Sequence, residues 1–127
     1  MAKNILLVDN DKKLVKENAA YLTEKGYEVK VAATTKEAYE SVAASKPDAV
    51  VTEIMLEHVD SGFSLSYHLK KDYPELPVII LSDVVRKSGI QFGVSTHEQR
   101  EWIKADEFLE KPVNPETLEC HINRCFE

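Results

Sequence analysis

The chain is poor in the residues and segments that mark several specialised classes of protein. No apolar run approaches the roughly 20 residues that a membrane-spanning helix needs. Residues 1–4 lead directly into an apolar run, without the charged, apolar and cleavage regions of a secretory signal. The net charge of −6 disfavours non-specific binding to nucleic acid, which requires a basic face. We therefore expect a cytoplasmic protein with no direct nucleic-acid or membrane partner.

Cysteine and glycine are both scarce, with two and four residues respectively. Cys120 and Cys125 are five residues apart on a predicted helix, so they do not share a face and a disulfide between them is disfavoured. Two unpaired thiols are consistent with a reducing compartment. None of the glycines forms a phosphate-cradling loop after a strand, which argues against a nucleotide- or flavin-binding protein.

The length and composition are those of one globular domain, residues 1–127. Apolar residues make up 43% and charged residues 30%, which is ordinary for a protein with a packed core. Strand and helix patterns alternate from end to end, which is typical of an α/β fold with a doubly wound parallel sheet. The expected strands are 5–8, 27–32, 48–53, 77–82 and 107–110. The expected helices are 12–25, 35–45, one from about residue 62 to 72, 95–104, and one that follows Asn114.

Helix boundaries carry local signals. Gly26 stands where a C-cap glycine is expected. Thr35 is the predicted N-cap of the second helix. Asn114, followed by Pro115 and Glu116, has the order of N-cap, first-turn proline and first-turn acid. On the first helix, an apolar face is expected from Leu14, Val15, Ala19 and Leu22.

Four apolar runs each lead into a polar residue. Residues 5–8 precede Asp9, 49–52 precede Glu53, 77–81 precede Ser82, and 108–110 precede Lys111. If these runs are parallel strands of one sheet, their carboxyl ends meet in one crevice, where open α/β sheets bind ligands. Carboxylates, a hydroxyl and an ammonium group together suit a divalent cation and a phosphoryl group.

With these residues at its strand ends, the chain resembles the receiver domain of two-component response regulators over essentially its whole length. The resemblance implies a flavodoxin-like sheet of five strands in the order 2-1-3-4-5, flanked by five helices. It also implies a signalling domain in a phosphorelay rather than an enzyme.

The resemblance places a metal site and a phospho-acceptor at the first and third strand ends. Asp9 and Asn10 match the acidic pair that holds Mg²⁺ in the family, Glu53 matches the acceptor aspartate, and the Met55 carbonyl matches a backbone ligand. Asparagine supplies a neutral oxygen in place of a carboxylate, so we expect a weak Mg²⁺ site. Asp11 is a candidate substitute ligand, but as the start of a helix it is better suited to capping. Asp83 is another candidate, at a position where the family prefers a small residue.

The remaining site positions are those that respond to phosphate in the family. Ser82 matches the hydroxyl that turns toward the phosphate. Phe108 matches the aromatic switch position, and without a hydroxyl it can move but cannot form a new hydrogen bond. Lys111 matches the ammonium group that neutralises the carboxylates or the phosphate. Pro112 matches a proline that in the family follows a cis peptide bond.

Glu53 leaves three readings open. Its carboxylate lies one carbon–carbon bond, about 1.5 Å, farther from the backbone than that of aspartate. It could act as a permanent imitation of a phosphorylated aspartate, or as a degenerate site, in a pseudo-receiver that works without phosphorylation. It could instead be a true acceptor, phosphorylated with Mg²⁺. An engineered aspartate-to-glutamate change is the third reading.

The resemblance also indicates a surface for protein partners. Many receivers bind partners through the region that corresponds here to the 83–105 segment, strand five and the last helix. The partner would be a sensor histidine kinase or a downstream effector. Phe92, Trp102 and Ile103 are the apolar candidates in that segment, with core packing as the alternative role. Either the domain works alone or it belongs to a chain with an output domain.

Overall fold

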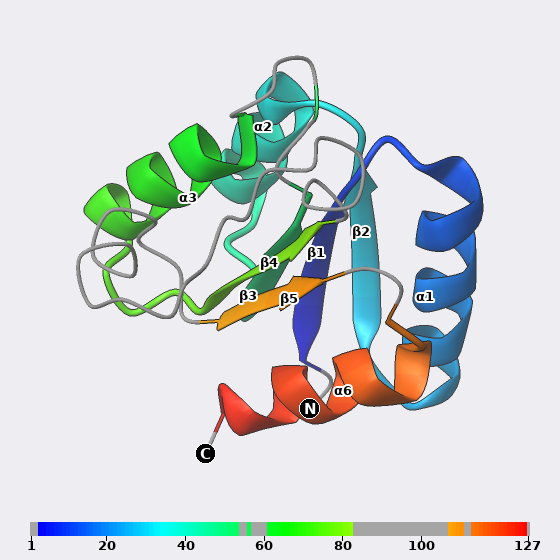
Figure 1. The fold of residues 1–127 in the computed structure, drawn as a ribbon. Helices are drawn as coiled ribbons and strands as arrows, with labels where there is room; N and C mark the ends of the chain where they lie inside the picture. The colour runs from blue at the N-terminus through cyan, green and yellow to red at the C-terminus, as the bar shows by residue number, and fades with distance from the viewer. Residues whose placement is uncertain (1–2, 54–55, 57–60, 83–106, 111–112, 127) are drawn as a thin grey trace.

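The computed structural model describes residues 3–53, 56, 61–82, 107–110 and 113–126 (Figure 1). Five strands and four helices lie in these ranges. The strands are β1 (Asn4–Val8), β2 (Glu28–Ala32), β3 (Ala49–Thr52), β4 (Val78–Ser82) and β5 (Glu107–Glu110). The helices are α1 (Lys12–Glu24), α2 (Thr35–Ala44), α3 (Ser61–Asp72) and α6 (Pro115–Arg124). The helix expected over 95–104 falls outside the described residues.

The sheet has the expected topology. All neighbouring strands are parallel, and their order is β2-β1-β3-β4-β5. Val8 pairs with Ala32 on one side and with Thr52 on the other, and Ser82 pairs with Glu110. The carboxyl ends of the strands therefore meet along one edge of the sheet, which confirms the predicted α/β doubly wound fold.

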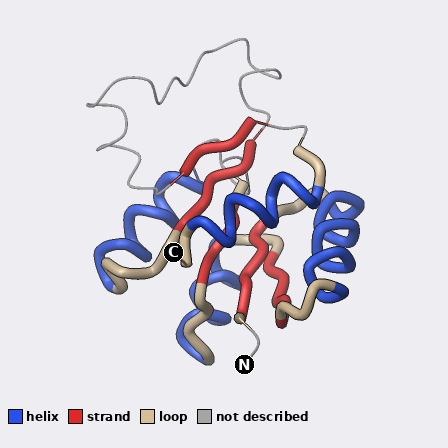
Figure 2. The backbone as a smooth tube through the Cα atoms, turned by 90° about the horizontal axis from the view of Figure 1, so that it is seen from below, coloured by secondary structure: helices blue, strands red, loops and turns tan. Residues whose placement is uncertain are grey.

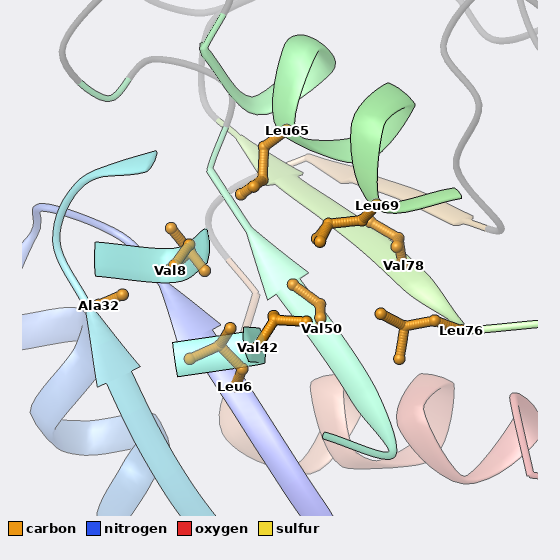
Figure 3. Packing of buried hydrophobic residues seen from close by; sticks show 10 residues of the cluster. Leu6, Val8, Ala32, Val42, Val50, Leu65, Leu69, Leu76 and Val78 are labelled. Carbon is orange, nitrogen blue, oxygen red and sulfur yellow. The ribbon is translucent and has the colours of Figure 1, made fainter. Parts of the chain in front are cut away.

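The helices cover both faces of the sheet (Figures 1 and 2). Because side chains alternate along a strand, β1, β2, β3 and β4 each contribute to two separate apolar clusters. Leu7 and Val51 pack with Leu22 of α1 and with Leu118 of α6 in one cluster. The other cluster includes Leu6, Val8, Ala38, Val42, Val50, Leu65, Leu69, Leu76 and Val78. That second cluster is shown in Figure 3, where Leu65 and Leu69 of α3 lie over the sheet.

The ends of α1 are closed by side-chain and glycine caps. The Asp11 carboxylate accepts the Leu14 amide at 3.1 Å, as an N-cap does. At the other end Gly26 has φ of +99°, a value that a side-chain-bearing residue rarely adopts. The Gly26 amide donates to Thr23 O and the Tyr27 amide donates to Leu22 O, each at 3.0 Å. These two bonds form a Schellman motif, so the prediction for Gly26 is confirmed.

Several boundaries differ by one residue from those that the sequence predicts, and two of these differences have a local cause. The N-cap of α2 is Thr34, not Thr35, because the extended Thr34 presents its hydroxyl to the Glu37 amide at 3.1 Å. β2 begins at Glu28 because the Tyr27 amide is still engaged in the end of α1. In addition α3 begins at Ser61, one residue before Gly62. The Asn114 cap of α6 is confirmed, since its side chain accepts the Thr117 amide at 2.8 Å.

Tyr27 connects the start of β2 to α6. Its hydroxyl lies 2.9 Å from Glu119 Oε2 and 2.6 Å from Asn123 Oδ1. Burial, together with the Glu119 carboxylate, raises the pKa of Tyr27 to about 12. The hydroxyl is therefore neutral at ordinary pH and joins residues 92 and 96 positions apart in the chain.

Cys120 is exposed and Cys125 is half-buried, and within the described residues neither of them forms a disulfide. Within the ranges that the structure describes, no helix is long and apolar enough to cross a membrane.

Candidate functional site

The site is built on the backbone at the carboxyl edge of the sheet. The Asp9 amide donates to Ala32 O at 3.0 Å, and the Glu53 amide donates to Val8 O at 2.8 Å. Both bonds extend the parallel hydrogen-bond pattern one residue beyond the strands. Asp9 and Glu53, which are 44 positions apart in the sequence, are thereby held at neighbouring places on this edge.

Both acidic side chains are buried. Asp9 is 8% exposed and Glu53 is 4% exposed. Alternation along the strands puts Asp9 in the same row as Leu7, and Glu53 in the same row as Val51. Leu7 and Val51 belong to the cluster under α1 and α6, so the two carboxylates lie on the α1 side of the sheet edge. A buried carboxylate needs hydrogen bonds or a cation, and Asp9 Oδ1 accepts the Asp11 amide at 2.9 Å.

Asn10 and Asp11 lie at the rim of the site and are exposed. Asn10 Nδ2 lies 3.4 Å from the carbonyl of Leu56, so Asn10 reaches the loop that follows β3. The Asp11 carboxylate caps α1 through the Leu14 amide, which confirms its capping role; its role as a substitute metal ligand stays a prediction. At the rim, Asn10 therefore presents a neutral amide at the position where the resemblance has a second carboxylate.

The described residues include as many carboxylates as a magnesium site usually has, but few further oxygen ligands. Magnesium takes oxygen ligands in octahedral geometry and is usually held by one or two carboxylates plus water. Asp9 and Glu53 supply two carboxylates, and Asn10 supplies an amide oxygen. Among the described residues no cluster of three or more histidine, cysteine or acidic side chains is arranged to hold a metal ion. The donor set fits Mg²⁺ with a low ligand charge.

Several predicted site positions are outside this description. Met55, Asp83, Lys111 and Pro112 are not among the described residues, nor are Phe92, Trp102 and Ile103. The backbone of Ser82 ends β4 and that of Phe108 lies in β5, opposite Ile80, but their side chains are outside the described part of the chain. The roles of all these residues stay predictions.

Two histidines, His68 and His121, contact side chains of neighbouring elements or of their own helix. The His68 ring lies edge-on to Tyr39 and Tyr67, with centroids 6.3 and 5.4 Å apart. His121 Nδ1 lies 2.7 Å from Glu107 Oε1 and joins α6 to β5. His58 and His97 are outside the described residues.

One buried polar residue near the site was missed by the sequence reasoning. Asn18, on α1, is 3% exposed and lines a small cavity together with Asp9 and Glu53. It lies three residues after Val15 and four before Leu22, both of them buried. A polar residue in the middle of an apolar helical face was the signal that could have identified it.

The sequence and the fold of this chain are similar to those of known proteins. A sequence model of the response regulator receiver domain matches residues 5–123. The chain belongs to the response regulator receiver domain family. Response regulator MprA of Mycolicibacterium vanbaalenii is 31% identical over 122 residues, which are 93% of this chain and 48% of that protein. The receiver thus spans about half the length of such relatives.

Solved structures agree on the fold. Chemotaxis response regulator CheY4 of Vibrio cholerae superimposes with a TM-score of 0.82 at 23% identity, over 98% of this chain and 99% of that chain. The non-phosphorylated HemR receiver domain of Leptospira biflexa has a TM-score of 0.80 at 26% identity, over 98% of this chain and 94% of that chain. The fold of this receiver is therefore that of CheY-like proteins.

Proposed function

We propose that this receiver transmits a signal without aspartyl phosphorylation, with Glu53 as a built-in substitute for the phosphorylated residue. The observation that carries the proposal is the position of Glu53, buried at the end of β3 beside Asp9. A glutamate without a function would be favoured at an exposed position, where its charge stays in water and has no cost of burial. On this reading the domain acts by binding proteins, and it is not an enzyme.

The length of the side chain is the reason to expect poor phosphorylation. Glutamate places its carboxylate about 1.5 Å farther from the backbone than aspartate does. Phosphoryl transfer depends on in-line positioning and on charge compensation around the transferred group. A displacement near 1 Å can cost on the order of a hundredfold in rate. The same extra length would bring the Glu53 carboxylate toward the positions that Ser82 and Lys111 occupy in the resemblance.

Weak magnesium binding is the second part of the proposal. Asp9 and Glu53, with the amide oxygen of Asn10, would hold the ion, and Met55 would contribute its carbonyl. A bound Mg²⁺ would offset the negative charge of an incoming phosphoryl group. With a neutral amide in place of one carboxylate, the affinity is lower than that of a site with three acids.

The partners follow from the family. The receiver would act in the cytoplasm on a sensor histidine kinase or a downstream effector, through the 83–105 segment, β5 and α6. The net charge of −6 favours protein partners over nucleic acid. On α6 the exposed side includes Glu116, Cys120 and Asn123, while Leu118 and Ile122 are buried. That helix therefore presents a polar surface.

A labelling experiment tests the proposal. The unmodified protein, Glu53→Asp and Glu53→Gln are incubated with acetyl phosphate and Mg²⁺, and the covalent phosphate is measured by mass spectrometry. We expect Glu53→Asp to be labelled, and the unmodified protein to be labelled roughly a hundredfold more slowly, so that no label is detected on the same timescale. Base-labile labelling of the unmodified protein that disappears in Glu53→Gln would show the alternative function, a Mg²⁺-dependent phospho-acceptor at Glu53.

A second measurement separates a phosphate substitute from an idle residue. Amide chemical shifts of residues 53, 82 and 111 are compared between the unmodified protein and Glu53→Gln. A substitute requires that removing the charge shifts the amides of Ser82 and Lys111. Unchanged shifts at both positions mean that Glu53 does not act on them. The amide shifts of Glu53→Asp with bound beryllofluoride and Mg²⁺ serve as the reference for the phosphorylated state.

A further inference from the structure

Asn18 is a buried polar residue for which the fold provides no described partner. It lies in the middle of α1 between the buried residues Val15 and Leu22, and it is 3% exposed. Its side-chain oxygen Oδ1 is buried and has no hydrogen-bond partner among the described residues. Leaving a buried acceptor unsatisfied costs about 1–3 kcal/mol, so such an atom calls for an explanation.

Asn18 lines a cavity that reaches Glu53. The cavity measures about 10 Å³, which is room for about one water molecule. Its aliphatic walls come from both the sheet and α1, and its polar lining includes Asp9, Glu53 and Asn18. The two acids stand at the ends of the rows that contain Leu7 and Val51, which also line it. The helix α1 and the carboxyl edge of the sheet therefore line one small, partly open cavity.

The polar groups that line the cavity favour an occupant that can donate hydrogen bonds. An amide oxygen and an ionised carboxylate both accept hydrogen bonds, so Asn18 Oδ1 cannot bond to Asp9 or Glu53 directly. A water molecule has two hydrogens and can donate one to each side. A magnesium ion keeps several of its own waters and needs more room than this cavity gives, so an ion held by the same two acids would lie outside the cavity.

We propose that one buried water joins Asn18 Oδ1 to the carboxylate pair of Asp9 and Glu53, which makes Asn18 a positioning residue for the acceptor position. The water satisfies the orphan acceptor and holds the carboxylates toward α1. A change of charge or position at Glu53 then alters a hydrogen bond that ends on α1. The inference deepens the proposed function and rests on it for the meaning of Glu53 as a signalling position.

The direct test is a high-resolution crystal structure of the unmodified protein grown in metal-free buffer with a chelator. We expect one ordered water within hydrogen-bond distance of Asn18 Oδ1 and of Asp9 or Glu53. The water should be absent from Asn18→Leu, whose side chain fills the cavity, and retained in the control Leu22→Val. A dry cavity, or an Asn18 amide turned so that it donates directly to a carboxylate, overturns the proposal.

Stability measurements in solution provide a second test, which needs no crystal. Asn18→Leu is combined with Glu53→Gln and with Asp9→Asn, and the unfolding equilibrium constant of each protein is obtained from urea titrations. We expect the double mutant with at least one of the acids to deviate from additivity by roughly fivefold. The Leu22→Val control, combined with the same acid variants, should be additive within about twofold. Additivity for both Asn18 combinations contradicts the water link.

The two proposals can fail separately. The water experiments use no phosphodonor, so they report on Asn18 whether or not Glu53 is ever phosphorylated. Labelling of the unmodified protein on Glu53, with the water present, would reject the phosphorylation-independent function and leave the role of Asn18 standing.

Discussion

Replacing Tyr27 by phenylalanine tests how far α6 depends on one hydroxyl group. The ring remains in place, and only the oxygen that faces Glu119 and Asn123 is removed. A hydrogen bond to a neutral group contributes about 0.5–1.5 kcal/mol and one to a charged group about 1.5–3 kcal/mol. The single hydroxyl hydrogen serves two acceptors at a half-buried site, so we expect a loss of about 1–2 kcal/mol.

The loss is measured by urea and thermal unfolding at pH 7. For a domain of this length, 1 kcal/mol corresponds to about 4 °C in the melting temperature. Tyr67→Phe is the matched control, because Tyr67 is 49% exposed and no hydrogen bond of its hydroxyl connects elements in the described structure. A Tyr27→Phe protein as stable as the control would refute the reasoning from hydrogen bonds.

The pKa of Tyr27 adds a pH dependence with a definite sign. Folding raises this pKa from 10.0 to about 12, so the folded state favours the neutral hydroxyl. The resulting stabilisation is fully present below pH 10 and is lost as the pH rises from 10 to about 12. The difference in stability between the unmodified protein and Tyr27→Phe should therefore shrink over that range. Parallel stability curves between pH 10 and 12 would show that the hydroxyl is not held as the structure has it.

Three further outcomes are expected. Asn10→Asp should tighten Mg²⁺ binding roughly tenfold in calorimetric titrations, because it adds a carboxylate to the ligand set. A micromolar affinity of the unmodified protein for Mg²⁺ would contradict the argument from ligand charge. Lys111→Ala should destabilise the protein less in a Glu53→Gln background, because no Glu53 charge is then left without a partner. A double-mutant cycle that shows no coupling between positions 53 and 111 would mean that Glu53 does not point toward Lys111. Asp11→Ala should cost about 1 kcal/mol in urea unfolding by removing the acceptor of the Leu14 amide, whereas an unchanged stability would deny the cap.

Much of the fold could be predicted because its signals are local. The alternation of apolar runs and helical patterns needs only neighbouring residues, and it identified all five strands. Gly26 and Asn114 were identified as caps because glycine tolerates positive φ and an asparagine oxygen accepts helix amides. The N-cap Thr34 was missed because two adjacent threonines offer the same chemistry, and only the backbone shows which one is extended.

The candidate site was predicted in part. Parallel strands bring their carboxyl ends together, so Asp9 and Glu53 were expected at one edge, and the hydrogen bonds from their amides show that edge. The choice between capping and metal binding for Asp11 could not be made from the sequence. A carboxylate can serve either purpose, and the 3.1 Å contact with the Leu14 amide shows that Asp11 caps the helix.

The sequence by itself determined the order of elements and the strand ends that carry polar residues, and by resemblance it matched Glu53 to the acceptor position of the family. Only the tertiary structure decided which side chains line the same cavity. Asn18 lies 9 positions after Asp9 and 35 before Glu53, yet all three line one cavity. Their meeting depends on the register of β1 with β3 and on the rotation of α1 about its axis. Both are set by non-local packing, because burying Val15 and Leu22 against the sheet turns Asn18 inward as well.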